Sequence, residues 1–148
     1  MKILLASDHA GYDLKRDLIA ELSSRPDVEV TDLGPDSADS VDYPDYAHLL
    51  SRRFLQGGFD SAILICNSGI GMSMAANRHR GIRAALCLFP AMAWWARHHN
   101  NANVLVLGGG FTAPFLAMEI VDVFLREPFD GGRHERRTEK LDRCGGTE

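Results

Sequence analysis

The chain has 148 residues, enough for one domain with a substantial core, and 45% of them are hydrophobic, as in a globular protein. A formal net charge of −4 argues against the basic surface of a nucleic-acid-binding domain. No segment reaches the roughly 20 apolar residues that span a bilayer, and the apolar start stops at Ser7-Asp8-His9, too early for a secretory signal.

Short apolar segments alternate with amphipathic segments along the chain. A first strand is predicted at 3–6, and the helix after it has an apolar stripe that contains Leu14, Leu18 and Leu22. Further strands are predicted at 28–31, 62–66, 83–88 and 104–107, and further helices at 44–56, 72–79, 90–98 and 113–126. We expect the strands to be buried on both faces, as in a parallel sheet.

A strand followed by a helix, repeated five times, predicts a doubly wound, Rossmann-like α/β fold. It has a five-stranded parallel sheet with helices on both faces. We expect residues 1–148 to form a single domain. After Pro128 the composition turns polar, which predicts a C-terminal arm at about 128–148 with a short helix and a frayed end from Cys144.

Cysteine and histidine usage bears on compartment and metal binding. The three cysteines stand at the irregularly spaced positions 66, 87 and 144. An odd number without a Cys-x-x-Cys pair favours reduced thiols in the cytoplasm over a disulfide framework. The six histidines show no spacing typical of metal ligands. We therefore expect a cytoplasmic protein without a structural zinc site.

Polar or glycine-rich loops follow the first, third and fifth predicted strands, at 7–11, 66–71 and 108–110. In open α/β sheets, ligands bind beyond the carboxyl ends of the strands. The three loops are therefore predicted to meet and form one site at this edge of the sheet.

The loop at 66–71 has the features of an anion site. Cys66 ends a strand, Gly69 and Gly71 allow backbone N–H groups to turn inward, and a helix N-terminus adds partial positive charge. Such a loop can bind a phosphate or stabilise an enediolate oxygen, and it favours the thiolate form of cysteine. A buried structural cysteine beside an ordinary turn is the alternative interpretation.

Two other phosphate-binding loops differ from this one at a specific residue. A dinucleotide-binding fingerprint needs a third glycine, and Met74 stands there. A low-molecular-weight tyrosine phosphatase needs an arginine six residues after its cysteine, and Met72 stands there. Both the nucleotide-binding and the phosphatase interpretations are disfavoured.

The remaining polar candidates each have two interpretations. Asp8 and His9 can orient a substrate hydroxyl or exchange a proton with it, or Asp8 can cap the first helix. His99 can transfer protons near neutral pH, or interact with a helix C-terminus. Arg133 and Arg137 share a face if they lie on one helix, where they can clamp a phosphate or belong to a solvated charged surface. The residues alone leave these alternatives open.

Seven motifs, in order, resemble those of one family. They are Ser7-Asp8-His9-Ala10-Gly11, Asp42-Tyr43-Pro44, Ile65-Cys66-Asn67-Ser68-Gly69-Ile70-Gly71, Ala75-Ala76-Asn77, Gly81-Ile82-Arg83-Ala84-Ala85, His99-Asn100-Asn101-Ala102-Asn103-Val104-Leu105 and Gly131-Gly132-Arg133-His134. From Ile3 to about Arg137 the chain resembles ribose-5-phosphate isomerase B and the galactose-6-phosphate isomerase subunits. The resemblance implies an aldose–ketose isomerase of a phosphorylated sugar that needs no metal ion and no cofactor, with ribose 5-phosphate as the first expected substrate.

The resemblance also implies a role for each matched residue. Cys66 is the base that moves a proton between C1 and C2, Ser68 moves protons at the sugar oxygens, and His99 opens the furanose ring. The backbone of 69–71 forms the anion hole for a cis-enediolate. The implied substrate contacts are Asp8, Tyr43, Asn67, Gly69, Ile70, Gly71 and Asn100, with His9, Arg133 and Arg137 at the phosphate.

Members of the family are dimers or tetramers whose sites combine residues from two subunits. We therefore expect a homodimer or homotetramer in which the arm and His99 serve the partner's Cys66, without nucleic-acid or membrane partners. The chain departs from the family pattern at two places that bear on the choice of substrate. Asn67-Ser68 replaces a common Gly-Thr pair, and Gly110 stands where many relatives carry arginine. Allose 6-phosphate, galactose 6-phosphate and erythrulose 4-phosphate remain alternative substrates, and a non-catalytic sugar-phosphate-binding subunit is an alternative function.

Overall fold

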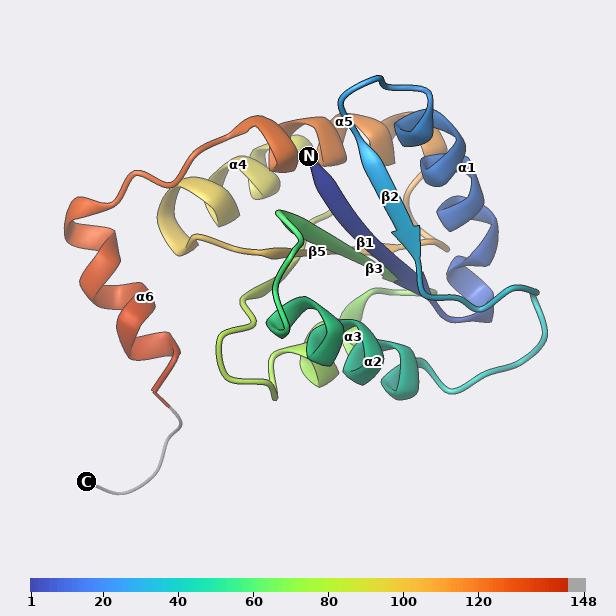
Figure 1. Cartoon of the computed structure of the whole chain (residues 1–148), viewed down its shortest axis with the longest axis horizontal. Helices are drawn as coiled ribbons and strands as arrows, with labels where there is room; N and C mark the ends of the chain where they lie inside the picture. The colour runs from blue at the N-terminus through green and yellow to red at the C-terminus, as the bar shows by residue number, and fades with distance from the viewer. Residues whose placement is uncertain (144–148) are drawn as a thin grey trace.

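The computed structural model describes residues 1–143 as one parallel five-stranded sheet with helices on both faces (Figure 1). The strands are β1 (Lys2–Ser7), β2 (Glu29–Asp32), β3 (Ser61–Cys66), β4 (Ala84–Leu86) and β5 (Val104–Gly108). The helices are α1 (Tyr12–Ser23), α2 (Tyr43–Leu55), α3 (Ile70–Ala76), α4 (Pro90–Asn100), α5 (Pro114–Arg126) and α6 (Glu135–Leu141), with short 3-10 helices η1 (His9–Gly11) and η2 (Gly132–His134). The strand order is β2-β1-β3-β5-β4, and the predicted doubly wound fold is confirmed.

The central strand β3 divides the core into two layers. All six of its residues are buried, and successive side chains point to opposite faces of the sheet. Ile63 and Ile65 pack in the layer formed with α1, α4 and α5, whereas Leu64 and Cys66 pack against α2 and α3. Full burial of a leucine or isoleucine side chain contributes roughly 1.5–3 kcal/mol, so these layers fix the position of the strand that ends in Cys66.

The prediction that all strands are buried on both faces is wrong for β2 and β4. The residues of β4 are half-buried, and those of β2 are half-buried or exposed. The reason is the strand order, which places these two strands at the edges of the sheet. The strand predicted at 83–88 is also shorter, and the helix predicted at 72–79 begins earlier, at Ile70.

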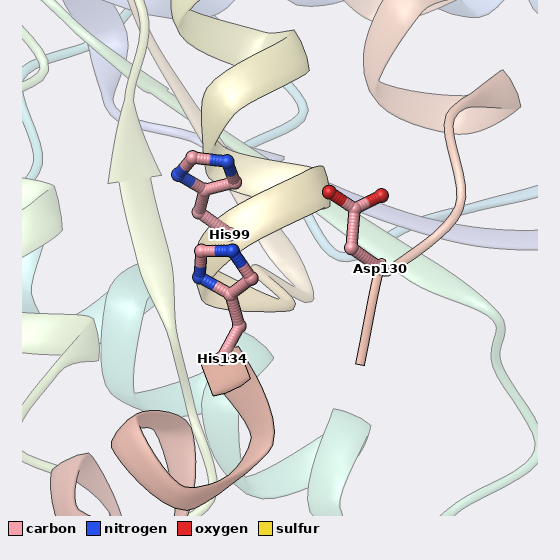
Figure 2. Close-up of side chains that lie close together, drawn as sticks. All are labelled: His99, Asp130 and His134. Atoms are coloured by element: carbon pink, nitrogen blue, oxygen red, sulfur yellow. The ribbon is translucent and has the colours of Figure 1, made fainter. Parts of the chain in front are cut away.

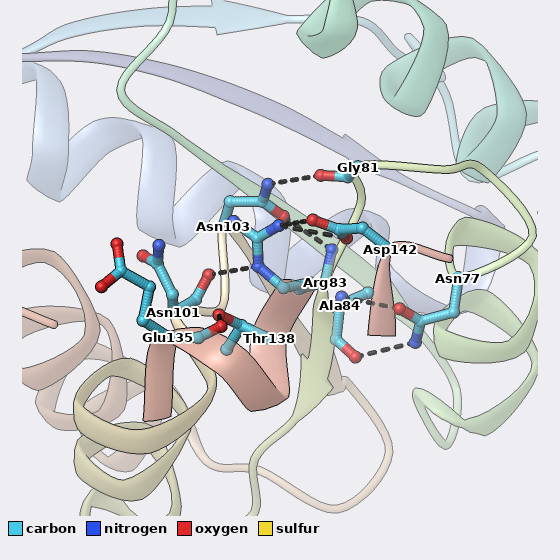
Figure 3. A network of polar contacts seen from close by, with 9 residues as sticks. All are labelled: Asn77, Gly81, Arg83, Ala84, Asn101, Asn103, Glu135, Thr138 and Asp142. Carbon is cyan, nitrogen blue, oxygen red and sulfur yellow. Dashed lines mark hydrogen bonds and ion pairs between the residues drawn. The ribbon is translucent and has the colours of Figure 1, made fainter. Parts of the chain in front are cut away.

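The C-terminal arm leaves the body of the domain after α5, and α6 lies beside it at the left of Figure 1. Arg83 holds the far end of the arm, because its Nη1 lies 2.9 Å from Asp142 Oδ2 while its Nε donates to the carbonyl of Asn101 (Figure 3). The short helix predicted after Pro128 is present as α6, whereas the expected frayed segment from Cys144 lies outside the described residues. No helix in residues 1–143 has the length and apolar character required to cross a membrane.

Candidate active site

The loops after β1, β3 and β5 meet at the carboxyl edge of the sheet, as predicted. Backbone hydrogen bonds join them, because Asp8 N–H donates to the Ile65 carbonyl at 3.0 Å and Gly109 N–H donates to the Cys66 carbonyl at 2.8 Å. Gly110 N–H donates to the Asn67 carbonyl at 2.9 Å. The three loops therefore form one continuous structure around Cys66.

Cys66 ends β3 with only 4% of its surface exposed. The N–H of Gly69 donates to its sulfur at 3.2 Å, and the N–H of Ile70 donates to Ser68 Oγ at 3.3 Å. Both donors are backbone N–H groups of the loop, so the loop itself holds the sulfur of Cys66 and the hydroxyl of Ser68 in position. The sulfur is thus both packed in the core and held by the loop.

The second described cysteine provides a contrast. Cys87 is 1% exposed, and burial raises the pKa of its thiol to about 12. Its sulfur donates to the carbonyl of Ala85 at 3.7 Å, which holds it as a neutral thiol. Of the two cysteines in the described part of the chain, Cys66 is the one whose sulfur accepts a backbone N–H hydrogen bond at the carboxyl edge of the sheet.

The shape of the 66–71 loop depends on glycines at two positions. Gly69 has φ +77°, in the left-handed region, and a Cβ there would overlap the side chain of Leu86. A Cβ at Gly71 would lie 2.6 Å from the ring of Tyr43, which is 41% exposed at the first position of α2. Tyr43 therefore packs against the start of α3 and lies at the candidate site.

The structure places Asp8 and His9 at the same edge. Asp8 is 6% exposed, and its Oδ1 accepts the N–H of Gly11 at 2.9 Å. Asp8 therefore caps the 3-10 helix η1, whereas Gly11 stands at the cap of α1, the helix that the capping interpretation assigns to Asp8. His9 is exposed, and its Nδ1 lies 3.2 Å from both the backbone N and O of Val41. The loop before α2 therefore orients the imidazole of His9.

The two unusual residues of the site, Asn67 and Gly110, are in contact. Both are exposed beside Cys66, and a Cβ at Gly110 would overlap Oδ1 of Asn67. The side chain of Asn67 therefore occupies the space that any side chain at position 110 would need.

A second group of predicted residues lies at the opposite edge of the sheet. His99 and Asn100 are at the end of α4, close before Val104, and Val104 pairs with Ala62 at the start of β3. The strand from Ala62 to Cys66 alone spans about 13 Å. The structure of one chain therefore does not bring His99 and Asn100 to Cys66, and the arm lies with them (Figure 1).

At this edge, the ring of His99 stacks on that of His134, with centroids 4.0 Å apart and planes at 21° (Figure 2). Burial, followed by the charge of His99, lowers the pKa of His134. Candidate ligand atoms of His99, His134 and Asp130 lie within 4.8 Å of one another. Arg133 Nε donates to His134 Nε2 at 3.3 Å, and Asp130 contacts His98. Two of the three candidate ligands, His134 and Asp130, therefore already interact with other side chains of the protein.

Arg133 and Arg137 are both exposed on the arm, and they do not lie on one α-helix, the condition under which their spacing would place them on one face. Arg133 belongs to η2 and Arg137 to α6, which begins at Glu135. Gly131 and Gly132 have φ values of +64° and +56°, which an α-helix does not accommodate, so the helix starts after them.

Comparisons with known proteins agree with this architecture. The sequence profile of the family described as Ribose/Galactose Isomerase matches residues 3–141. The chain belongs to this family. Ribose-5-phosphate isomerase B of Escherichia coli is 42% identical over 140 residues, which cover 95% of this chain and 93% of the relative. A probable ribose-5-phosphate isomerase B of Mycoplasma pneumoniae is 44% identical over 140 residues, 94% of this chain and 91% of the relative.

Solved structures of family members have the same fold. A ribose 5-phosphate isomerase of Thermotoga maritima superposes with a TM-score of 0.93 at 56% identity, over 95% of this chain and 97% of that one. The type B ribose 5-phosphate isomerase of Trypanosoma brucei has a TM-score of 0.91 at 42% identity, over 95% and 96% of the two chains. The resemblance inferred from the seven motifs is confirmed.

The sequence did not predict the contacts that His134 and Asp130 make in this member of the ribose/galactose isomerase family. These residues lie more than 30 positions from His98 and His99, so no local periodicity links them. The change to polar composition after Pro128 located the arm, but only the fold shows what the arm contacts.

Proposed function

We propose that this chain is an aldose–ketose isomerase that interconverts ribose 5-phosphate and ribulose 5-phosphate, with Cys66 as the base. The observation that carries the proposal is the hydrogen bond from Gly69 N–H to the Cys66 sulfur, within a loop of backbone donors. Relatives named ribose-5-phosphate isomerase B match more than nine-tenths of the chain, which supports the choice of substrate.

The proposed reaction is a proton transfer between neighbouring carbons. The Cys66 thiolate removes the proton from C2 of the open-chain aldose, leaving a cis-enediolate, and the resulting thiol returns that proton to C1 to give the ketose. Backbone N–H groups of 69–71 stabilise the negative charge that develops on the oxygen. Ser68 moves a proton between the oxygens on C1 and C2, so no redox partner is required.

We further propose that the complete site combines two subunits of a homodimer, which can associate further into a homotetramer. The supporting observation is the separation of His99, Arg133 and Arg137 from Cys66 by the length of the sheet. The partner's His99 would open the sugar ring, and the partner's arm would contact the phosphate together with His9.

Large apolar side chains that lie outside the core support this assembly. Five of them, on α3, on the segment after β4 and on α4, are about half exposed: Ile70, Met74, Leu88, Phe89 and Trp95. Exposed apolar side chains favour burial against another surface, and a second copy of the chain can provide one. The two described cysteines are free thiols, which supports a cytoplasmic location.

The contact between Asn67 and Gly110 favours a second candidate substrate, another pentose or hexose phosphate. Turnover of ribose 5-phosphate, allose 6-phosphate, galactose 6-phosphate and erythrulose 4-phosphate by the purified protein tests the choice. We expect turnover of ribose 5-phosphate, its loss in Cys66→Ala with substrate affinity retained, and its retention in the matched control Cys87→Ala. Binding without turnover of any of the four sugars would contradict the enzyme proposal and indicate a binding subunit.

A further inference from the structure

We propose that His98 is a positioning residue: together with Glu127 and Asp130 it forms a charged clamp that fixes the base of the C-terminal arm. The clamp, defined as these three residues, holds the arm so that His134 faces His99 and Arg133 is presented to solvent. His98 is distinct from His99, the residue that matches the family motif and that follows it on α4.

The contacts of the clamp join the end of α4 to the segment after α5. His98 Nε2 lies 2.9 Å from Glu127 Oε2, and His98 Nδ1 lies 2.5 Å from Asp130 Oδ1. Asp130 N–H donates to the carbonyl of His98 at 3.1 Å, and Arg97 Nε donates to the carbonyl of Glu127 at 3.1 Å. Both ring nitrogens face carboxylates, so both can donate only when the imidazole is protonated.

The surroundings of His98 hold its ring in one orientation. The ring stacks on Trp94 with centroids 3.9 Å apart and planes at 21°, and the His98 side chain is 12% exposed. An aromatic face stabilises a neighbouring cation, so Trp94 also favours the protonated form. The arrangement fixes His98, and through it the backbone at Asp130.

The position of Asp130 determines where the arm starts. Asp130 precedes the Gly131-Gly132 turn, and its carboxylate lies beside the stacked rings of His99 and His134 (Figure 2). The opposite end of the arm is held by Arg83 and Asp142 (Figure 3). Arginine stays charged at all accessible pH values, so of these two attachments only the clamp at the base of the arm responds to pH near neutrality.

The charged groups around the clamp determine the sign of this response. Hydrogen bonds to Glu127 and then Asp130 raise the pKa of His98, and the same bonds lower the pKa of each carboxyl group. The charge of Arg126 also lowers the pKa of Glu127. The charges of His99 and His134 also lower the pKa of Asp130.

The clamp therefore has an upper and a lower pH limit. Because the pKa of His98 is raised in the folded chain, His98 stabilises the attachment of the arm fully below its pKa in the unfolded chain, about 6.5, and this stabilisation is lost as pH rises through its folded pKa. Because the carboxyl pKa values are lowered in the folded chain, the carboxylates stabilise the attachment above their unfolded pKa values of about 4. This stabilisation is lost as pH falls through their folded pKa values. The arm is held between these limits and loosens above the pKa of His98.

Nuclear magnetic resonance and hydrogen exchange test the clamp without any assay of activity. We expect the His98 imidazole to titrate above the ordinary value of about 6.5, and the protection factors of amides 131–137 to fall about tenfold across that titration. His98→Gln, which cannot ionise, should lack this pH dependence, whereas Arg83→Gln should weaken protection but retain its pH dependence. A His98 midpoint at or below the ordinary value, or equal pH dependence in the wild type and His98→Gln, would overturn the proposal.

The consequence for catalysis rests on the proposed function. If the arm supplies phosphate contacts, His98→Gln should raise KM for ribose 5-phosphate about tenfold while changing kcat less than about twofold. An unchanged KM together with lost protection of the arm would contradict the positioning role. An inactive wild-type protein would instead remove the proposed function, and the exchange experiment would still decide on the clamp.

Discussion

The amide N–H of Gly69 donates to the sulfur of Cys66 across 3.2 Å, from a position three residues further along the same loop. Gly69 can make this contact because it adopts φ +77°, where a side chain is strained and would overlap Leu86. The geometry of the candidate base thus depends on a residue that has no side chain.

Gly69→Ala should therefore reduce turnover by about 100-fold, the scale expected when a backbone donor is displaced from an anion site. Gly57→Ala is a matched control, because Gly57 has φ +83° but nothing lies within 4 Å of an added Cβ. Both variants should lose about 1–2 kcal/mol of stability from backbone strain. Gly69→Ala should lose more, because its Cβ overlaps Leu86, and only Gly69→Ala should lose kcat. Steady-state kinetics and urea unfolding of both variants check this, and equal losses of kcat would show that strain alone is responsible.

The contact between Asn67 and Gly110 predicts coupled effects on substrate preference. Gly110→Ala should displace the Asn67 side chain and change kcat/KM for ribose 5-phosphate about tenfold, with a much smaller effect in an Asn67→Gly background. The measurement is a double-mutant cycle of kcat/KM on ribose 5-phosphate and allose 6-phosphate. Additive effects of the two substitutions would mean that the side chains do not share this space.

Lys15 is fully buried, and its ammonium group donates to Asp32 at 2.7 Å and to the carbonyl of Pro35 at 2.8 Å. Lys15→Met leaves these acceptors without their donor, so we expect a loss of about 3 kcal/mol in the free energy of unfolding. Lys2→Met, which removes an exposed pair with Glu29, should cost less than about 1 kcal/mol. Urea unfolding compares the two, and equal losses would contradict the structural importance of the buried ammonium.

Much of the fold could be predicted because its signals are local. The apolar run that ends at Cys66 and the glycines after it predicted a buried strand followed by an anion-binding loop. The structure contains the buried strand and a loop in which the N–H of Gly69 donates to the sulfur. The exposure of β2 and β4 could not be predicted in this way, because it depends on their places at the edges of the sheet.

The second half of the candidate site was only partly predictable. The resemblance singled out His99, but its stacking on His134 arises from packing between segments 35 residues apart. Similarly, the spacing of Arg133 and Arg137 fits a helix, and the two glycines before Arg133 delay the start of that helix. Local spacing identified these residues, whereas tertiary structure determined their neighbours.

The central claim is that Cys66 of one subunit and His99 of its partner form one isomerase site. The direct test is to co-express Cys66→Ala and His99→Asn chains with different tags, purify the mixed dimer, and measure its turnover of ribose 5-phosphate. Neither parent dimer has an intact site. In the mixed dimer one of the two sites is intact, because it combines Cys66 of the His99→Asn chain with His99 of the Cys66→Ala chain, so we predict about half of wild-type turnover. A mixed dimer no more active than its parents would contradict the shared site.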